Sequence, residues 1–310
     1  MRFSFLGPRG TFCQQALNSI ATEQQAEHIP AHDAPRAIRM VRRGEADYAV
    51  VPIENSVEGG INATIDALGR HSDLTIQAEM LVPITFVLAV KPGTPIEAVR
   101  RISTHAAAWT QCRDWLMENL PDVLYLPASS TAAAAKALAE EADPGFEATL
   151  VSPLAAEQYG LQALRREVAD NPDAVTRFVM IGHAGQVPQR TGSDKTTLLV
   201  HLPADRSGAL LALLEQFASR GVNLTRIESR PTGDSLGRYA FSIDAEGHLF
   251  DERIQSVLRG LHRVSPKVVF LGSYPSADQH RVKLAAATAD ADFSSAREWV
   301  RKLVSEGRGV

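Results

Sequence analysis

Asp170-Asn171-Pro172-Asp173-Ala174-Val175-Thr176-Arg177-Phe178-Val179-Met180-Ile181-Gly182 joins a turn to a strand. The Asn-Pro-Asp part is rich in turn formers, and residues 175–181 are rich in β-branched and apolar residues. In a strand, Thr176 and Phe178 face one side of the sheet and Arg177 faces the other. A hydroxyl, a guanidinium and an aromatic ring therefore sit on one strand. An ordinary edge strand would also accept these three side chains.

The composition is that of an ordinary globular protein. Its 310 residues are 45% hydrophobic and 22% charged, with a formal net charge of -4. A chain of this length accommodates two or three domains. The basic excess that marks nucleic-acid binders is absent, and no apolar run approaches the roughly 18 residues of a membrane span. We therefore expect neither a nucleic acid nor a membrane as a partner.

The N-terminus and the two cysteines predict a cytoplasmic protein. The apolar start is halted by Gly7-Pro8, so it is too short for a signal peptide and indicates a first strand. Cys13 and Cys112 lack a CxxC pattern or a His-rich context. A disulfide framework or a zinc site is therefore not expected.

Strands alternate with helices from residue 1 to residue 182, which predicts an α/β unit with a largely parallel sheet. The first strand leads through Gly7-Pro8-Arg9-Gly10-Thr11-Phe12 into a helix. Such a turn suits anions, because unpaired backbone N–H groups and the helix dipole face the ligand. Residues 91–95 and the run before Thr176 are points where the chain would pass between two lobes.

A second strand, residues 47–53, ends in a polar loop that contains Glu54, Asn55 and Ser56. Open α/β sheets bind ligands at the carboxyl ends of their strands, so these side chains are candidate substrate ligands. Asn55 and Ser56 would also serve as caps of the helix predicted at 61–68, and this alternative stays open.

The alternation continues toward the middle of the chain. Residues 84–90 and 101–105 predict buried strands, and residues 106–120 predict one helix that carries Gln111. Ala128-Ser129-Ser130-Thr131 caps an alanine-rich helix, and Ser152 with Pro153 ends a further strand and starts a helix.

The pattern changes after a linker at residues 185–194. Strand, helix, two strands, helix and strand follow, which predicts a small two-layer domain with an antiparallel sheet. These elements are expected at 195–202, 207–217, 222–230, 238–245, 251–261 and 267–271, with a turn at Thr232-Gly233-Asp234 between the middle strands. The tail, residues 273–310, predicts one amphipathic helix around 296–304.

Three motifs in this order resemble the signatures of prephenate dehydratases: Gly7-Pro8-Arg9-Gly10-Thr11-Phe12, Pro52-Ile53-Glu54-Asn55-Ser56 and Thr176-Arg177-Phe178. The downstream βαββαβ unit resembles an ACT domain. Its Gly208-Ala209-Leu210 and Glu228-Ser229-Arg230-Pro231 are similar to the paired phenylalanine-binding motifs of that family. Together the five stretches span roughly residues 3 to 275.

The resemblance implies a domain organisation. Residues 1–184 are expected to form a catalytic α/β domain of two lobes around a cleft, similar to type II periplasmic-binding-protein folds. Residues 185–194 are the linker, 195–273 the ACT regulatory domain, and 274–310 a tail with one helix. Because the chain starts at its first strand, no fused chorismate mutase is expected.

One stretch departs from the family pattern. The family commonly has Ser-His-Pro-Gln-Ala-Leu-x-Gln-Cys, where this chain has Thr104-His105-Ala106-Ala107-Ala108-Trp109-Thr110-Gln111-Cys112. The hydroxyl at Thr104 and the amide at Gln111 are kept, whereas the Pro-Gln step is lost. The departure puts in doubt any role for the first Gln of the pattern.

The resemblance also implies an activity and its residues. The expected reaction is the decarboxylative dehydration of prephenate to phenylpyruvate in phenylalanine biosynthesis, by a carbon–oxygen lyase without metal, nucleotide or flavin. The catalytic task falls on Thr176, whose hydroxyl would stabilise the leaving hydroxide by a hydrogen bond. The implied substrate-binding residues are Gly10, Thr11, Glu54, Asn55, Ser56, Thr104, Gln111, Arg177 and Phe178.

Two of these roles have alternatives. Arg177 either binds a substrate carboxylate or, because it should point away from Thr176, braces Glu54 or another acid. Phe178 either belongs to the hydrophobic core or contacts the substrate. Asn55, Thr104 and Gln111 are the expected polar anchors.

The ACT resemblance implies feedback by L-phenylalanine and a homodimer or homotetramer formed through these domains. The implied effector-binding residues are Gly208, Ala209, Leu210, Asn223, Leu224, Glu228, Ser229 and Arg230. Two alternative functions stay open, an arogenate dehydratase and a two-lobed amino-acid sensor without catalysis.

Overall fold

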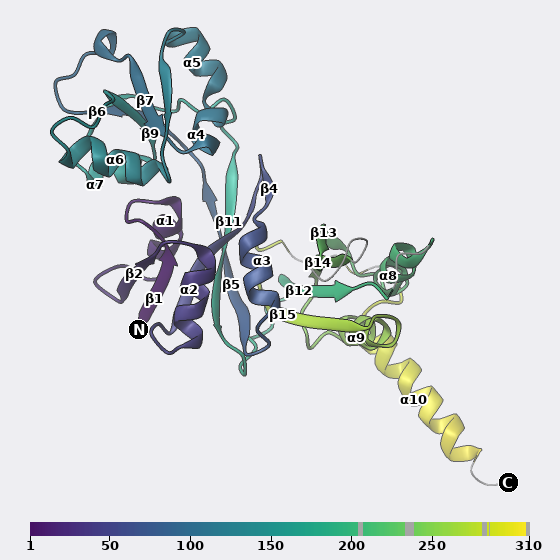
Figure 1. Cartoon of the computed structure of the whole chain (residues 1–310). Helices are drawn as coiled ribbons and strands as arrows, with labels where there is room; N and C mark the ends of the chain where they lie inside the picture. Colours follow the sequence, from purple (N-terminus) through teal and green to yellow (C-terminus); the bar gives the residue numbers. More distant parts are fainter. Residues whose placement is uncertain (204–206, 233–238, 281–283, 285, 308–310) are drawn as a thin grey trace. The chain divides into compact units, whose positions relative to one another are not determined.

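The computed structural model describes residues 1–203, 207–232, 239–280, 284 and 286–307. The chain forms two compact units (Figure 1). The N-terminal unit comprises Met1–Ala67 and Met80–Ile181, and the C-terminal unit comprises Leu68–Glu79 and Gly182–Val310.

The first lobe of the N-terminal unit is built on a sheet in the order β2–β1–β3–β11, and β5, of which only residues 80–83 belong to this unit, lies next to β11. Strands β1, β2 and β3 are parallel, whereas β11 runs antiparallel to β3. Its core includes Phe5, Leu17 and Val50. The elements are β1 (Arg2–Leu6), α1 (Phe12–Asn18), β2 (Glu27–Ala31), α2 (Ala34–Arg42), β3 (Tyr48–Asn55), β4 (Gly59–Gly60), α3 (Asn62–Gly69), β5 (Leu74–Pro83) and β11 (Val175–His183).

The second lobe has its own sheet in the order β10–β6–β9–β7–β8. One apolar cluster joins this sheet to α4 and α5, and a second joins it to α6 and α7. The elements are β6 (Val87–Val90), the 3-10 helix η1 (Ile96–Ala98), β7 (Arg101–Thr104), α4 (Ala106–Gln111), α5 (Arg113–Asn119), β8 (Leu124–Pro127), α6 (Thr131–Glu140), β9 (Ala148–Val151), α7 (Pro153–Gln158) and β10 (Gln162–Arg165). The prediction of a two-lobed α/β unit is confirmed (Figure 1).

Three details of that prediction are wrong. The sheets are mixed rather than largely parallel, because β11 returns antiparallel to β3 and β6 runs antiparallel to β9 and β10. The chain enters the second lobe between β5 and β6, not at residues 91–95, since β6 and β7 share one sheet. The helix predicted at 106–120 is two helices, because Cys112 has φ -120° and ψ 15°.

Several elements escaped the sequence pattern. Strands β2, β5, β8 and β10 and helix α2 were not predicted. Strand β2 contains Pro30 and lies at the edge of its sheet, where proline is tolerated but obscures the pattern. Helix α2 begins at the N-cap Asp33, whose side chain accepts a hydrogen bond from Arg36 N.

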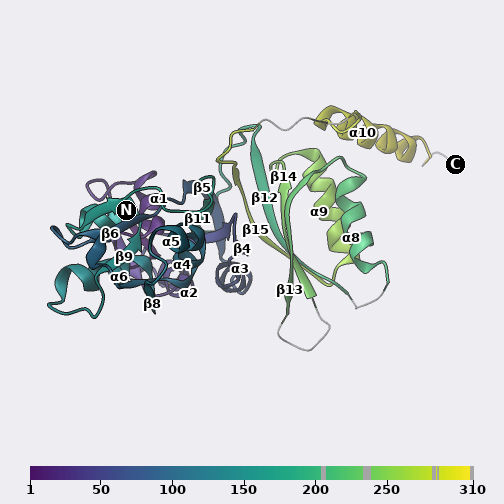
Figure 2. The same cartoon turned by 90° about the horizontal axis from the view of Figure 1, so that it is seen from above.

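The C-terminal unit has the predicted βαββαβ order, with four antiparallel strands arranged β13–β14–β12–β15. Helices α8 and α9 cover one face of this sheet (Figure 2). The elements are β12 (Asp194–His201), α8 (Ala209–Ala218), β13 (Leu224–Pro231), β14 (Tyr239–Glu246), α9 (Glu252–Val264), β15 (Lys267–Pro275) and α10 (Asp290–Glu306). Gly233 and Asp234 of the expected turn and Arg238 of the expected strand lie outside the described residues.

Strand β15 also meets β5 within this unit. Gly272 pairs with Ile76 in a parallel register and has φ +147°. A Cβ atom at Gly272 would lie 2.3 Å from the Ile76 carbonyl oxygen, so only glycine permits this approach.

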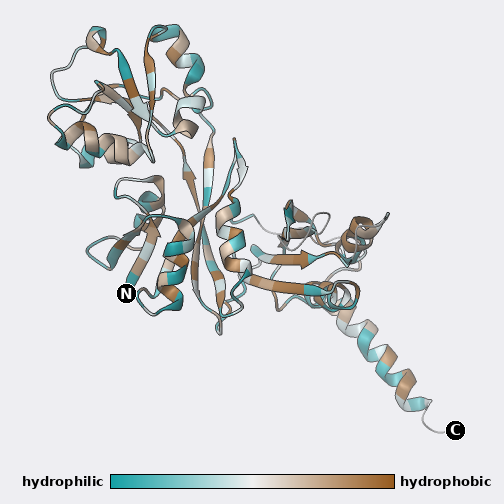
Figure 3. Cartoon of the chain, in the orientation of Figure 1, coloured by the Kyte–Doolittle hydropathy of each residue, from teal (hydrophilic) through white to brown (hydrophobic). Residues whose placement is uncertain are grey.

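Hydropathy follows the layers. Figure 3 shows brown, apolar strands in the sheets, and α10 alternates between apolar and polar residues along its length. Helix α10 is longer than predicted, and its Trp299 is 63% exposed. In the described part of the chain, no helix is long and apolar enough to cross a membrane.

Candidate active site

A cavity of ≈ 290 Å³ lies within the N-terminal unit and takes residues from both lobes. Five of the predicted site residues line it: Thr11, Asn55, Gln111, Thr176 and Phe178. The other lining residues are Leu6, Gly7, Phe12, Cys13, His32, Pro52, Ile61, Ile84, Phe86, His105, Ala107, Ala108, Ser129, Ser130 and Thr131. Residues from both lobes thus line one open cavity.

Thr176 and Asn55 face each other across the β3–β11 pairing at the edge of this cavity. The two residues are partners in the antiparallel register, and Asn55 Nδ2 donates a hydrogen bond of 2.8 Å to Thr176 Oγ1. Thr176 is 6% exposed. Because its oxygen accepts from Asn55, the hydroxyl proton of Thr176 remains available for a ligand.

The amide of Asn55 is fixed by its own loop. Its Oδ1 accepts hydrogen bonds from Val57 N at 2.8 Å and Glu58 N at 3.1 Å. A flipped amide would set its NH2 group against these two donors, so the bonds determine which end faces Thr176. Asn55 therefore both shapes the turn after β3 and orients the threonine hydroxyl.

Arg177 lies outside the residues that line the cavity. Its guanidinium forms an ion pair with Glu54, with 3.4 Å between Arg177 Nη1 and Glu54 Oε2, and the Arg177 side chain is 6% exposed. The two residues are also partners in the β3–β11 register. The register shifts after Arg177, so that Phe178 lies opposite Pro52. Phe178 belongs both to the first-lobe core and to the cavity wall.

Three further predicted residues make their hydrogen bonds within the protein and do not line the cavity. Gly10 N donates to Gln14 Oε1 at 2.6 Å, so this turn N–H is already engaged. Ser56 exchanges two bonds of 2.9 Å with Val175, through its N–H and its Oγ. The Thr104 hydroxyl donates to the Leu150 carbonyl at 2.7 Å. These contacts hold strands and turns together around the cavity.

Gln111 differs from these residues because its side-chain amide has a vacant acceptor. The residue is 7% exposed, and its Oε1 is buried without a hydrogen-bond partner among the described residues. A buried carbonyl without a donor costs about 1–3 kcal/mol. The amide oxygen of Gln111 is therefore a hydrogen-bond acceptor without a donor among the described residues.

Three helix N-termini lie at the cavity; that of α1 was predicted as part of the site, whereas those of α4 and α6 were not. Thr11, His105 and Ser130 are the N-caps of α1, α4 and α6, and all three line the cavity. His32, Ser129 and Thr131 also went unrecognised. Each of these residues follows a strand or begins a helix. Their position near the carboxyl end of a strand is the sequence signal that could have predicted them as site residues.

The cavity wall is largely apolar, with polar groups at a few positions and no charged side chain among the described residues. Among the described residues that line it, none is Lys, Arg, Asp or Glu. Burial raises the pKa of the Cys13 thiol to about 12, so this cysteine stays protonated at neutral pH. An anionic ligand would therefore be held by N–H and O–H donors, with helix dipoles in support.

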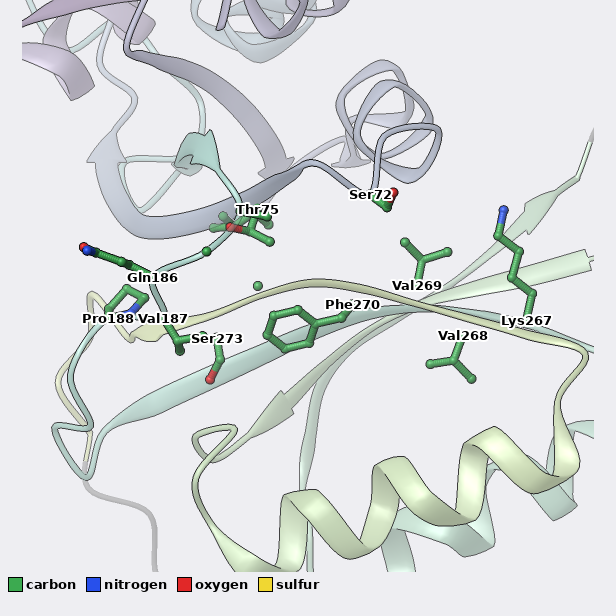
Figure 4. Close-up of a pocket in the computed structure, with 14 residues that line it drawn as sticks. Ser72, Thr75, Gln186, Val187, Pro188, Lys267, Val268, Val269, Phe270 and Ser273 are labelled. Atoms are coloured by element: carbon green, nitrogen blue, oxygen red, sulfur yellow. The ribbon is translucent and has the colours of Figure 1, made fainter. Parts of the chain in front are cut away.

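The predicted effector residues lie on two elements of the C-terminal unit. Gly208 is the N-cap of α8 with φ +79°, and Glu228 on β13 forms an ion pair with Arg226 at 2.9 Å. Leu210 is 39% exposed. A separate cavity of ≈ 370 Å³ in this unit lies between β15 and residues 184–188 (Figure 4). None of the predicted effector residues lines that cavity.

Comparison with known proteins identifies relatives over the whole chain. The family model for prephenate dehydratase matches residues 3–186, and the model for the ACT domain matches residues 196–263. A prephenate dehydratase from Mycolicibacterium gilvum is 39% identical over 315 residues, which cover 98% of this chain and 98% of that protein.

Two solved structures share the fold. The crystal structure of prephenate dehydratase from Arthrobacter aurescens in complex with L-Phe has a TM-score of 0.93 and 53% identity, covering 98% of this chain and 100% of that chain. The structure of GqqA, described as a novel type of quorum quenching acylase, has a TM-score of 0.79 and 29% identity, covering 89% and 98%.

Proposed function

The chain belongs to the prephenate dehydratase family of lyases, and we propose that Thr176 is its catalytic residue. The observation that carries this proposal is the hydrogen bond from Asn55 Nδ2 to Thr176 Oγ1. It occupies the threonine oxygen and leaves the O–H to act as a donor in a cavity of ≈ 290 Å³.

The reaction requires a donor of this kind. The bond between the ring and the carboxylate breaks, and CO2 leaves. The released electron pair makes the ring aromatic and displaces the ring hydroxyl, which takes up a proton and leaves as water. Aromatisation favours the reaction, so a hydrogen bond from Thr176 to the departing oxygen suffices, with the proton relayed by water.

The substrate dianion requires partners for two carboxylates. We propose that the first turns of α1, α4 and α6 supply N–H groups, together with the hydroxyl of Ser130. In this proposal Arg177 braces Glu54 instead of touching the substrate, as their ion pair favours. Gly10, Ser56 and Thr104 then shape the site through the bonds they already make.

The cavity favours prephenate over arogenate. Arogenate carries an ammonium group where prephenate has a keto group, and an ammonium in a closed site needs a carboxylate or several carbonyls. None of the described residues that line the cavity is Asp or Glu. A keto group needs only an N–H or O–H donor, and the described lining residues supply such donors.

The test of this function is an assay of purified protein with prephenate and with arogenate. Formation of phenylpyruvate from prephenate, with little turnover of arogenate, supports the proposal. Faster turnover of arogenate would assign the cavity to that substrate. Absence of turnover of both, with tight ligand binding, would favour the sensor.

We also propose that L-phenylalanine, the end product of the pathway, inhibits the enzyme through the ACT domain. The L-Phe complex of the relative from Arthrobacter aurescens supports an effector of this chemistry. Several of the effector residues are open to solvent within one chain: Leu210 is 39% exposed, and Asn223 and Ser229 are also exposed. Strand β13 is the edge of its sheet, so a second copy would complete the site and form at least a homodimer.

This proposal includes a domain division. Residues 1–184 form the catalytic domain and residues 195–273 the ACT regulatory domain. Residues 185–194 link the two domains, and residues 274–310 form the tail. Inhibition requires that phenylalanine bind the less active state more tightly than the active state.

A further inference from the structure

We propose that Asp170 is a positioning residue for catalysis, because its backbone bond to the end of α4 and its carboxylate cap on α5 fix the place of Gln111, which lines the cavity. The inference rests on the proposed function, in which the cavity lined by Gln111 binds prephenate. Asp170 lies in the turn before β11, the strand that carries Thr176.

Asp170 replaces a missing helix cap. Cys112 is the N-cap of α5 but makes no side-chain hydrogen bond. The Asp170 carboxylate accepts instead from Asp114 N and Trp115 N, each at 3.0 Å, although it lies more than fifty residues farther along the chain. A carboxylate at this position also interacts favourably with the helix dipole.

The same residue fixes the end of α4. Asp170 N donates a hydrogen bond of 2.7 Å to the Gln111 carbonyl, and Gln111 is the last residue of that helix. Asp170 therefore contacts both sides of the break at Cys112. If the two helices fused into the continuous helix that the sequence predicts, Gln111 would lose its terminal position.

The Gln111 side chain depends on this backbone anchor. Its Oε1 has no partner among the described residues, so no described contact fixes that end of the amide. Backbone contacts thus set where the amide lies, and Asp170 supplies the contact from the turn that leads to Thr176. The turn itself is tied down where Asn171 Oδ1 accepts from Asp173 N at 3.0 Å.

The experiment compares steady-state kinetics of Asp170→Ala, Gln111→Ala and the double variant in the full-length protein. We expect each single change to raise KM for prephenate about 5-fold or more, with kcat changed less than KM. If Asp170 acts through Gln111, the double variant will have nearly the KM of Gln111→Ala. Asp170→Asn keeps one acceptor oxygen and should lie closer to the parent enzyme.

Asp292→Ala is the matched control. It removes a carboxylate that accepts from Ala289 N at the start of α10, in the C-terminal unit, and should leave KM unchanged. Additive effects in the double variant, or an Asp170→Ala enzyme with lower thermal stability and parental KM, would overturn the inference. A parent protein without dehydratase activity would overturn the proposed function instead.

Discussion

The two cavities of this protein are alike in being lined mainly by apolar atoms, but they differ in the elements that line them. The cavity in the N-terminal unit has ≈ 290 Å³, and that in the C-terminal unit has ≈ 370 Å³. The first collects strand ends, helix N-caps and the vacant amide oxygen of Gln111. The second lies against β15, and Val187, Val269 and Phe270 are among the side chains that line it (Figure 4). Converging polar groups, rather than volume, therefore identify a site for a charged substrate.

The largest effect is expected from Thr176→Ala. Loss of the hydrogen-bond donor at the leaving oxygen should lower kcat about 100-fold, while the far-UV circular dichroism stays that of the parent. Thr176→Ser keeps the hydroxyl and should retain part of the activity. A kcat near that of the parent for Thr176→Ala would show that the Thr176 hydroxyl is not the catalytic donor.

A smaller loss, about 10-fold in kcat, is expected for Asn55→Asp. The carboxylate still accepts from Val57 N and Glu58 N, but it turns the Thr176 O–H away from the substrate because it accepts where the amide donated. Asn119→Asp makes the same chemical change where Asn119 Nδ2 donates to the Trp115 carbonyl, outside the cavity. Equal kinetics for these two variants would return Asn55 to a purely structural role.

Regulation should respond to Glu228→Ala without a change in the basal rate. We expect the phenylalanine concentration for half inhibition to rise at least 10-fold, with kcat in its absence within about 2-fold of the parent. Glu215→Ala, an exposed acid on α8, serves as the control. Undiminished inhibition of Glu228→Ala would direct the search for the effector to the cavity in Figure 4.

The smallest effect on catalysis is expected from Phe270→Ala, which enlarges the cavity of the C-terminal unit. Removing this partly buried ring should lower the free energy of unfolding by about 2–4 kcal/mol, measured in urea. The kcat and KM for prephenate should stay within about 2-fold. If the Phe270→Ala variant is fully folded under the assay conditions but has a much lower kcat than the parent, the cavity takes part in catalysis.

The sequence by itself determined the elements whose signals are local. The apolar run of β11, the N-caps at Ser130 and Ser152 and the βαββαβ order depend on neighbouring residues, and the structure has them as predicted. The family motifs likewise identified Thr176 and Asn55, which form a direct hydrogen bond. The roles of these residues in catalysis remain predictions.

Tertiary structure alone decided which polar groups already have partners. The sequence assigned Asn55, Thr104 and Gln111 one role as anchors. In the structure Asn55 orients Thr176 and Thr104 bonds to Leu150, and of these three side chains the amide oxygen of Gln111 is the one without a partner among the described residues. The break at Cys112 has no local cause, because the cap comes from Asp170. Hydrogen bonds between residues far apart in the chain depend on how the strands are brought together, and local patterns carry no record of that pairing.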